Sequence, residues 1–380
     1  MSMLTVSLIE REDYLNFVET QSYRNFLQYP SWADLKGEWK WSSEFLGWIT
    51  SDGTLVGGAV VLYRKVPGLN KFLAYIPRGP IIDWFSEIEL SDWFQPLFHH
   101  LKQRHVFSVK IDPPLVSKTW SAQRISQNIK DFQSHGLKNK KLTDILPDRI
   151  FNDVEYIQQE LAEMGWRKNT GKDSFDTVQP QYVFRLNMNA KSLEQIFSEF
   201  DPQWQQQISR AEQEGVEIQI GTEQDLPDFH RLLVYTGQRE QTQVRDLSYF
   251  EKMFESLIYE DPHRLRLYLA KQGEELLSSA IAIRVNGHTW DLYSAKKSDK
   301  PDDPSVFLLR WKMIQDSYHQ GDRIYDFRGI STTLNEDDPL FELLQFKMGF
   351  NGDACELMGE WDYPVIPMLH WAFDLYMKKR

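Results

Sequence analysis

The chain has 380 residues, of which 41% are hydrophobic and 26% charged, and its formal net charge is −12. This length gives room for two domains with separate cores, and the composition indicates folded globular protein throughout. A negative balance of this size excludes non-specific wrapping of nucleic acid. RNA contact would need a compact basic segment. The candidates are "LKNKK" (137–141) and "KKR" (378–380), for which solvated surface lysines are the simpler explanation.

The cysteine content and both ends of the chain point to the cytoplasm. One cysteine, Cys355, excludes an intramolecular disulfide and fits a reducing compartment. "MSMLTVSLIEREDY" lacks the basic and apolar parts of a signal peptide, and no apolar stretch is long enough to span a bilayer. The segment "PVIPMLHWAFDLYMKKR" (364–380) is apolar nearly all round. We expect a helix docked on a core, with peripheral contact to the inner membrane surface as the alternative.

Two parts of the chain follow one plan, which is an antiparallel hairpin, a further strand, a helix and a strand. Turn signals at Asp52-Gly53 and Gln272-Gly273 mark the hairpins. The first part comprises 44–66, 71–79, 91–104 and 106–113, and the second comprises 264–285, 288–296, 304–320 and 323–330. Asp303 is a suitable N-cap for the later helix, Pro304 suits its first position and Gly321 its stop. This order matches an acyltransferase core in which a mixed sheet opens around an acyl donor.

A polar segment containing glycine separates the two parts. This segment begins at residue 165 and leads into the expected strand "YVFRLNM" (182–188). We therefore place a domain boundary near residue 182. Helical patterns at 191–200 and 202–215 follow, interrupted at Asp201-Pro202, and then the strand 216–220. No sustained heptad pattern occurs, so we expect no long coiled-coil arm.

A lysine interrupts an apolar run near the C-terminus. In "LFELLQFKMGFNGD" (340–353), Lys347 is surrounded by residues that suit a core. An unpaired buried ammonium is costly, so this lysine needs a partner or a function. One interpretation is a structural lysine that pairs with Glu342 or Asp353, and the other is a lysine with a role in the functional site.

The chain resembles the FemABX family of non-ribosomal peptidyltransferases, which build peptidoglycan side bridges. The motifs that carry the resemblance run nearly the full length and are "FLQYPSWADLKGEW", "AYIPRGPIID", "VKIDPP", "QPQYVFRLNM", "SRAEQEGVEI", "TGQREQTQVRDLSYFEKMF", "LYSAK", "IYDFRGI" and "FKMGFNG…GEWDYP". The family implies an α/β fold of two tandem acetyltransferase-like (GNAT) domains. We expect them at 1–182, completed by 359–380, and at 183–358.

The resemblance also implies an activity and its partners. An amino acid moves from the ester of an aminoacyl-tRNA to an amine on the stem peptide of a peptidoglycan precursor. The acceptor is UDP-linked muramyl pentapeptide or its lipid-linked form. Because the ester is already activated, we expect no metal and no organic cofactor.

The family assigns a catalytic role to a lysine that matches Lys347. Charge builds on the carbonyl oxygen when an amine attacks an ester, and a positioned cation stabilises that transition state. Phe346 is expected to pack so that it orients the lysine. Asp112 in "KIDPP" is a candidate general base, although an aspartate before proline more often holds a turn.

The remaining site residues are expected to bind the acceptor. The resemblance places Lys36, Arg245 and Tyr249 against its phosphates and peptide, and the last two would share a face if both lay on one helix. Surface roles, or an ion pair between Arg245 and a neighbouring acid, are the alternatives. Tyr293 matches a cleft tyrosine of the family but could equally pack between sheet and helix. Some relatives carry an aromatic two positions before it, where this chain has Asp291.

The first domain contributes a further pair of expected cleft residues. Tyr75 and Arg78 in "AYIPRGP" would shape its cleft, although the Pro-Arg-Gly-Pro turn could be purely structural.

Two rival functions remain open from the sequence. One is an acyl-CoA N-acyltransferase, which usually needs a glycine-rich turn before a helix to hold pyrophosphate. The corresponding turns, "SDKPDDPSVF" and "IDWFSEIELSDW", are acidic and have no glycine cluster. The other rival is a binding module without catalysis.

Overall fold

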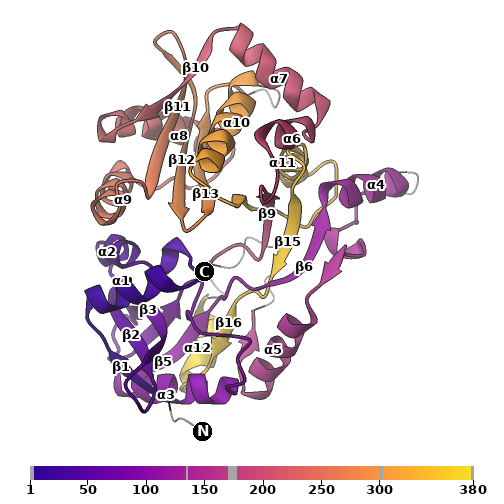
Figure 1. Cartoon of the computed structure of the whole chain (residues 1–380). Coiled ribbons are helices and arrows are strands. Elements are labelled where there is room, and N and C mark those ends of the chain that lie inside the picture. The colour runs from indigo at the N-terminus through magenta and orange to yellow at the C-terminus, as the bar shows by residue number, and fades with distance from the viewer. Residues whose placement is uncertain (1–3, 134–135, 170–177, 300–302, 378–380) are drawn as a thin grey trace. The chain divides into compact units, whose positions relative to one another are not determined.

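The computed structural model describes residues 4–133, 136–169, 178–299 and 303–377 (Figure 1). They form two compact units, one of residues 1–118, 150–181 and 356–380 and the other of residues 119–149 and 182–355. Among the described residues, no helix combines the length and apolar character needed to cross a bilayer.

The first unit is built on a mixed sheet with strand order β1-β2-β3-β4-β5-β16-β8. β2 and β3 form the predicted antiparallel hairpin, and β4 and β5 run parallel. The strands are β1 (Thr5–Leu8), β2 (Ser42–Ile49), β3 (Leu55–Lys65), β4 (Phe72–Ile76), β5 (Val106–Ile111), β8 (Arg167–Lys168) and β16 (Trp361–Tyr363). The helices are α1 (Arg11–Thr20), α2 (Pro30–Gly37), α3 (Leu90–Gln103), α5 (Asn152–Glu163) and α12 (Pro367–Met377), with the short turn η1 (Phe26–Gln28).

The second unit is built on a sheet with strand order β10-β11-β12-β13-β14-β9-β15-β6-β7. Its strands are β6 (Val116–Ser121), β7 (Arg149–Ile150), β9 (Tyr182–Asn187), β10 (Val216–Gly221), β11 (Leu265–Gln272), β12 (Glu275–Val285), β13 (His288–Lys296), β14 (Ile324–Gly329) and β15 (Asp353–Leu357). Its helices are α4 (Ala122–Gln133), α6 (Leu193–Ser198), α7 (Pro202–Gln213), α8 (Leu226–Arg239), α9 (Leu247–Glu260), α10 (Pro304–His319) and α11 (Pro339–Met348), with η2 (Leu142–Asp144) and η3 (Glu223–Asp225). β6, β7 and β15 each contain a point where the chain passes from one unit to the other.

The predicted order of hairpin, strand, helix and strand is confirmed in both units. In the second unit, α10 begins where the Asp303 carboxylate accepts the Ser305 N–H at 3.0 Å, and Gly321 beyond its end has φ of +79°. α10 is the longest helix of the described residues, with 16 residues, and it packs on β11 and β12 (Figure 1). The mixed α/β architecture expected from the sequence is therefore present.

One change of unit falls between residues 181 and 182, close to the sequence-based boundary, but the units also change at 118–119 and at 149–150, inside the stretch 1–182 that was assigned to one domain. Residues 119–149 pack with the second unit, because Trp120, Ile125, Ile129 and Leu142 belong to the core built around β9, β14 and α10. Residues 356–380 belong to the first unit, where β16 pairs with β5.

Candidate active site

The candidate site of the second unit lies where two parallel strands separate. β13 and β14 pair only from His288 with Ile324 to Trp290 with Asp326. A β-bulge between Ile281 and Ala282 disturbs the β12–β13 register at the same level, opposite Asp291. Beyond Trp290 and Asp326 the two strands are no longer paired, so their ends separate.

Lys347 is held on the buried face of α11. The helix starts where the Asp338 carboxylate accepts the Leu340 N–H at 3.0 Å, and its buried residues Phe341, Leu344 and Lys347 recur every three positions. Lys347 is only 6% exposed, and its Nζ donates to the Gly329 carbonyl oxygen at 2.6 Å. That carbonyl lies at the end of β14, so the ammonium is directed to the strand separation.

The charges around Lys347 nearly balance. Burial lowers the pKa of Lys347 to about 8, while Asp291 and Asp326 raise it and Arg310 and Arg328 lower it further. These carboxylates, rather than those of Glu342 or Asp353, are the acids that act on the lysine. With a pKa near 8, the side chain is mainly an ammonium at neutral pH.

Asp291 and Arg310 form a buried ion pair beside this lysine. Arg310 Nε lies 3.2 Å from Asp291 Oδ2, and the two side chains are 7% and 8% exposed. The guanidinium also lies over the Phe346 ring, 5.8 Å from its centroid. Asp291 thus has a specific cationic partner.

Asp326 organises the turn that presents the Gly329 carbonyl. Its carboxylate accepts Arg185 Nε at 2.9 Å and the Arg328 N–H at 2.7 Å, and His288 lies 3.4 Å away. Although burial alone would raise it, these cationic neighbours hold the pKa of Asp326 well below its ordinary value. Arg328 has φ of 65°, a left-handed conformation that costs about 1–2 kcal/mol and that the N–H bond to Asp326 helps to maintain.

Phe346 is packed among aromatic rings. Its centroid lies 5.3 Å from that of Phe307 and 5.4 Å from that of Phe350, and its carbonyl accepts Trp204 Nε1 at 2.9 Å. This packing restrains the helix turn that carries Lys347.

Arg245, Tyr249 and Tyr293 are brought together in the second unit. Tyr249 and Tyr293 share a hydrogen bond between their hydroxyls, and the Arg245 guanidinium lies 5.5 Å from the Tyr249 ring centroid. Arg245 lies two residues before α9, so the condition under which Arg245 and Tyr249 would share a helix face is not met. Within the described ranges Arg245 is exposed and has no ion pair with an acid, so the expected alternative pairing is not seen there.

Asp112, Tyr75 and Arg78 are brought together in the first unit. Asp112 follows β5 and is 1% exposed. Its carboxylate accepts the Tyr75 hydroxyl at 3.0 Å and the Arg78 N–H at 2.6 Å, while Arg78 Nη2 donates to the Pro180 carbonyl at 2.8 Å. Burial raises the pKa of Asp112 to about 6, although Arg78 opposes this. These contacts are those of an aspartate that holds a turn.

Lys36 belongs to the same unit, in the last turn of α2. Its Nζ lies 4.7 Å from the Trp32 ring centroid, and the side chain is partly exposed. The expected site residues therefore fall into two sets, one on each unit.

Sequence reasoning missed several charged neighbours of Lys347 and the carbonyl that accepts its hydrogen bond. Arg310 and Asp326 carried a usable signal, since each is a charge within an apolar run, "VFLLRWKMI" and "IYDFRGI". Arg185 and Gly329 act through long-range contacts and left no local signal.

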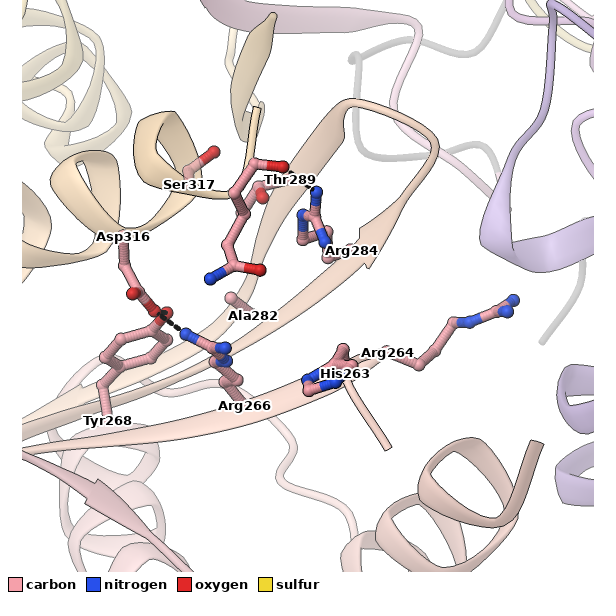
Figure 2. A pocket seen from close by; sticks show the side chains of 10 residues that line it. His263, Arg264, Arg266, Tyr268, Ala282, Arg284, Thr289, Asp316 and Ser317 are labelled. Atoms are coloured by element: carbon pink, nitrogen blue, oxygen red, sulfur yellow. Dashed lines mark hydrogen bonds and ion pairs between the residues drawn. The ribbon is translucent and has the colours of Figure 1, made fainter. Parts of the chain in front are cut away.

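A second polar pocket of the unit is occupied by its own ion pairs. Arg264, Arg266 and Arg284 line it together with Asp316 (Figure 2). Arg266 pairs with Asp316, Arg284 Nε lies 2.7 Å from Asp322, and Arg264 Nη1 lies 3.2 Å from Glu260. Each guanidinium is neutralised internally, so this cluster is a structural network. Over the described ranges, no group of three or more His, Cys, Asp or Glu side chains is arranged to hold a metal.

Comparison with known proteins extends over the whole chain. It is 21% identical to a lipid II:glycine glycyltransferase of Staphylococcus haemolyticus, over 96% of this chain and 94% of the relative. It is 20% identical to the protein of that name from Staphylococcus aureus strain MRSA252, over 96% of this chain and 94% of the relative.

Solved structures agree on the fold. The crystal structure titled FemX superposes with a TM-score of 0.79 at 19% identity, covering 97% of this chain and 99% of the other. A tandem GNAT protein from the clavulanic acid biosynthesis pathway superposes with a TM-score of 0.50 at 10% identity, covering 95% of this chain and 98% of the other. The FemAB family profile matches residues 9–273 and 263–378, and the chain therefore belongs to the FemAB family.

Proposed function

We propose that this protein is an aminoacyltransferase of peptidoglycan precursor synthesis that uses aminoacyl-tRNA as donor. The observation that carries the proposal is the buried ammonium of Lys347 at the strand separation in a FemAB family fold. The names of the curated relatives, lipid II:glycine glycyltransferases, support a stem-peptide amine as the acceptor and a lipid-linked precursor as its carrier.

The reaction needs one new bond and the loss of another. The acceptor amine attacks the ester carbonyl, a C–N bond forms, and the C–O bond to the tRNA ribose breaks. The proton lost by the nitrogen neutralises the departing ribose oxygen. Between these events the carbonyl oxygen carries negative charge, and the Lys347 ammonium is the group that would stabilise it. No step requires a metal or an organic cofactor.

The residues on both units have binding roles in this proposal. Arg245 beside Tyr249 and Tyr293 offers a cation on an aromatic support, and Lys36 offers another on the first unit. Both suit the phosphates and peptide of a UDP-linked or lipid-linked acceptor. Asp112 has a positioning role in the first unit, because one of its oxygens accepts the Tyr75 hydroxyl and the other accepts the Arg78 N–H.

An acyl-CoA donor is the rival that the geometry disfavours. Pyrophosphate binding at a helix start requires backbone N–H groups that have no other acceptor. At α10, the carboxylate of Asp303 already accepts the Ser305 N–H. Asp302, the other acid noted in this turn, lies outside the described residues. The Asp303 carboxylate at the start of α10 would also repel the negative charge of a pyrophosphate.

A transfer assay tests the proposal against both rivals. The purified protein is incubated with a bulk tRNA pool charged with labelled amino acids and with the UDP-linked muramyl pentapeptide, and in parallel with acetyl-CoA. We expect labelled amide product from the tRNA arm and none from the acetyl-CoA arm. Product from acetyl-CoA alone would establish the rival enzyme, and acceptor binding without product from either donor would indicate a binding module.

Removing the proposed acceptor contacts should weaken acceptor binding selectively. For Arg245→Ala and Lys36→Met we expect the Kd for UDP-muramyl pentapeptide to rise about ten- to a hundredfold. This is the usual loss of affinity when one charged hydrogen bond is removed. The Kd for aminoacyl-tRNA should change less. Calorimetry with each ligand makes the measurement.

Exposed cations elsewhere provide matched controls. Arg231 pairs with Asp228 on the surface of α8, and Lys65 is exposed at the end of β3. Arg231→Ala and Lys65→Met should leave both Kd values unchanged. Equal acceptor affinity in all four variants would reassign Arg245 and Lys36 to the solvated surface.

A further inference from the structure

One face of helix α12 exposes large apolar side chains. Met368 is 85% exposed, Trp371 66% and Leu375 43%. Spacings of three and four residues place these side chains on one face of the helix. We call them the α12 stripe. Ala372, on the same side, is also exposed, so the described part of this face carries no charge.

The opposite face of α12 is docked on the first unit. A ring nitrogen of His370 lies 2.9 Å from Ser108 Oγ, and the Phe373 ring centroid lies 5.3 Å from that of Phe107. The Ile366 N–H donates to the Phe107 carbonyl at 2.9 Å. These contacts with strand β5 fix which face of α12 is turned toward the unit. The α12 stripe could become buried only if they were broken. A contiguous exposed apolar face of this kind is typical of an interaction surface.

We propose that the α12 stripe lies on the surface of an anionic lipid bilayer. The inference rests on the proposed function, because it names the membrane contact through which a lipid-linked acceptor would be reached. Tryptophan, methionine and leucine suit the boundary between headgroups and acyl chains. At 11 residues, about 16 Å of helix, α12 can lie in this boundary but cannot span the bilayer.

The sequence that follows α12 favours a lipid partner. Lys378, Lys379 and Arg380 follow α12 in the sequence. An anionic bilayer presents an apolar layer and negative headgroups side by side, whereas a protein partner would have to supply both separately. The chain's net charge of −12 does not oppose this contact strongly, because charges farther than about 8 Å from the surface are screened at physiological salt.

Vesicle flotation tests the inference on the full chain. We expect the protein to float with vesicles of phosphatidylglycerol and phosphatidylethanolamine and to stay behind with pure phosphatidylcholine. The double variant Met368→Gln, Trp371→Gln should bind the anionic vesicles roughly tenfold or more weakly, because two apolar side chains no longer enter the interface. Replacing Lys378, Lys379 and Arg380 with glutamine should cost about fivefold per charge. Raising the salt concentration to 1 M should also weaken binding to the anionic vesicles, because salt screens the attraction between the basic residues and the headgroups.

The control uses apolar side chains that are equally exposed elsewhere. Leu146 is 79% exposed and Tyr259 is 90% exposed, both on the second unit. The double variant Leu146→Gln, Tyr259→Gln should bind vesicles like the unmodified protein. A melting curve of each variant checks that the fold is retained.

Three outcomes would overturn the inference. They are no vesicle binding by the unmodified protein, equal binding by the α12 and control variants, or a dimer in sedimentation velocity that the α12 variant abolishes without any vesicle binding. Since flotation contains neither tRNA nor acceptor, its result is independent of the transfer assay. Vesicle binding through the stripe without aminoacyl transfer would contradict the proposed function alone. Transfer to the soluble acceptor without vesicle binding would contradict the membrane contact alone.

Discussion

Replacing Lys347 with methionine is expected to lower single-turnover aminoacyl transfer on the order of 10²–10³, the usual loss when one oxyanion donor is removed. The stem of the side chain is retained, so the neighbours Phe341 and Leu344 should stay packed. Binding of both substrates should change little, because the charge develops only in the transition state. Rapid-quench measurement with charged tRNA and saturating acceptor gives the rate.

The pH profile separates a catalytic ammonium from a structural lysine. Because the pKa of Lys347 is about 8, turnover of the unmodified protein should fall as the pH rises through 8. The residual activity of Lys347→Met should lack this limb. Lys312→Met is the control, since Lys312 lies on the surface of α10 and pairs with Glu212 at 3.5 Å. Near-normal turnover in a well-folded Lys347→Met protein would end the catalytic assignment.

The same substitution should have two opposing effects on the free energy of unfolding. The pKa of Lys347 falls from 10.5 to about 8 on folding, which at 1.36 kcal/mol per unit means a cost of about 3 kcal/mol below pH 8. Between pH 8 and 10.5 the unfolded chain binds more protons than the native protein, so stability rises with pH in this window. Methionine removes that cost but leaves the Gly329 carbonyl without its donor, at about 1–3 kcal/mol. We therefore expect little net loss of stability at pH 7.

The sequence marked Lys347 as a charge inside an apolar run and predicted the order of elements around it. A charge within "LLQFKMGF" is a local anomaly, and burial cost alone makes it conspicuous. Hairpins and caps are also local signals, which is why the turns at Gly53 and Gly273, both with positive φ, were predicted correctly.

The surroundings of the lysine could not be predicted because they depend on contacts distant in sequence. Arg185 and Asp326 are 141 positions apart, and the separation of β13 from β14 has no composition signature. Segment 119–149 joins the second unit through the apolar residues of β6 and α4, which would suit either core. A shared helix face for Arg245 and Tyr249 was expected only if both lay on one helix, and α9 starts two residues after Arg245.

Replacing Asp291 with asparagine is expected to lower the free energy of unfolding by about 3–5 kcal/mol, the usual cost of leaving one charge of a buried pair without its partner. The substitution is nearly isosteric, so the loss would come from the Arg310 guanidinium rather than from a cavity. Arg310→Met should cost a similar amount because it leaves the Asp291 carboxylate. The double variant should lose less than the sum of the two, since no uncompensated charge remains. Urea titration of the three variants measures this coupling, and strict additivity would mean that the pair is not coupled.

The two substitutions should move the pH profile of turnover in opposite directions. Lys347 faces Asp291 on β13, Asp326 and Arg328 on β14, and Arg310 on α10. Loss of the Asp291 carboxylate should lower the pKa of Lys347 below 8, so activity at pH 7.5 falls and partly returns at lower pH. Loss of the Arg310 guanidinium should raise that pKa and move the alkaline limb upward. Asp322→Asn is the control, because Asp322 is buried and pairs with Arg284 at 2.7 Å but is not one of the four charged groups that shift the pKa of Lys347 most. It should destabilise the protein without moving the limb. A pair that served only to stabilise the fold would behave like Asp322, whereas opposite shifts from Asp291→Asn and Arg310→Met require that the pair sets the charge of the lysine.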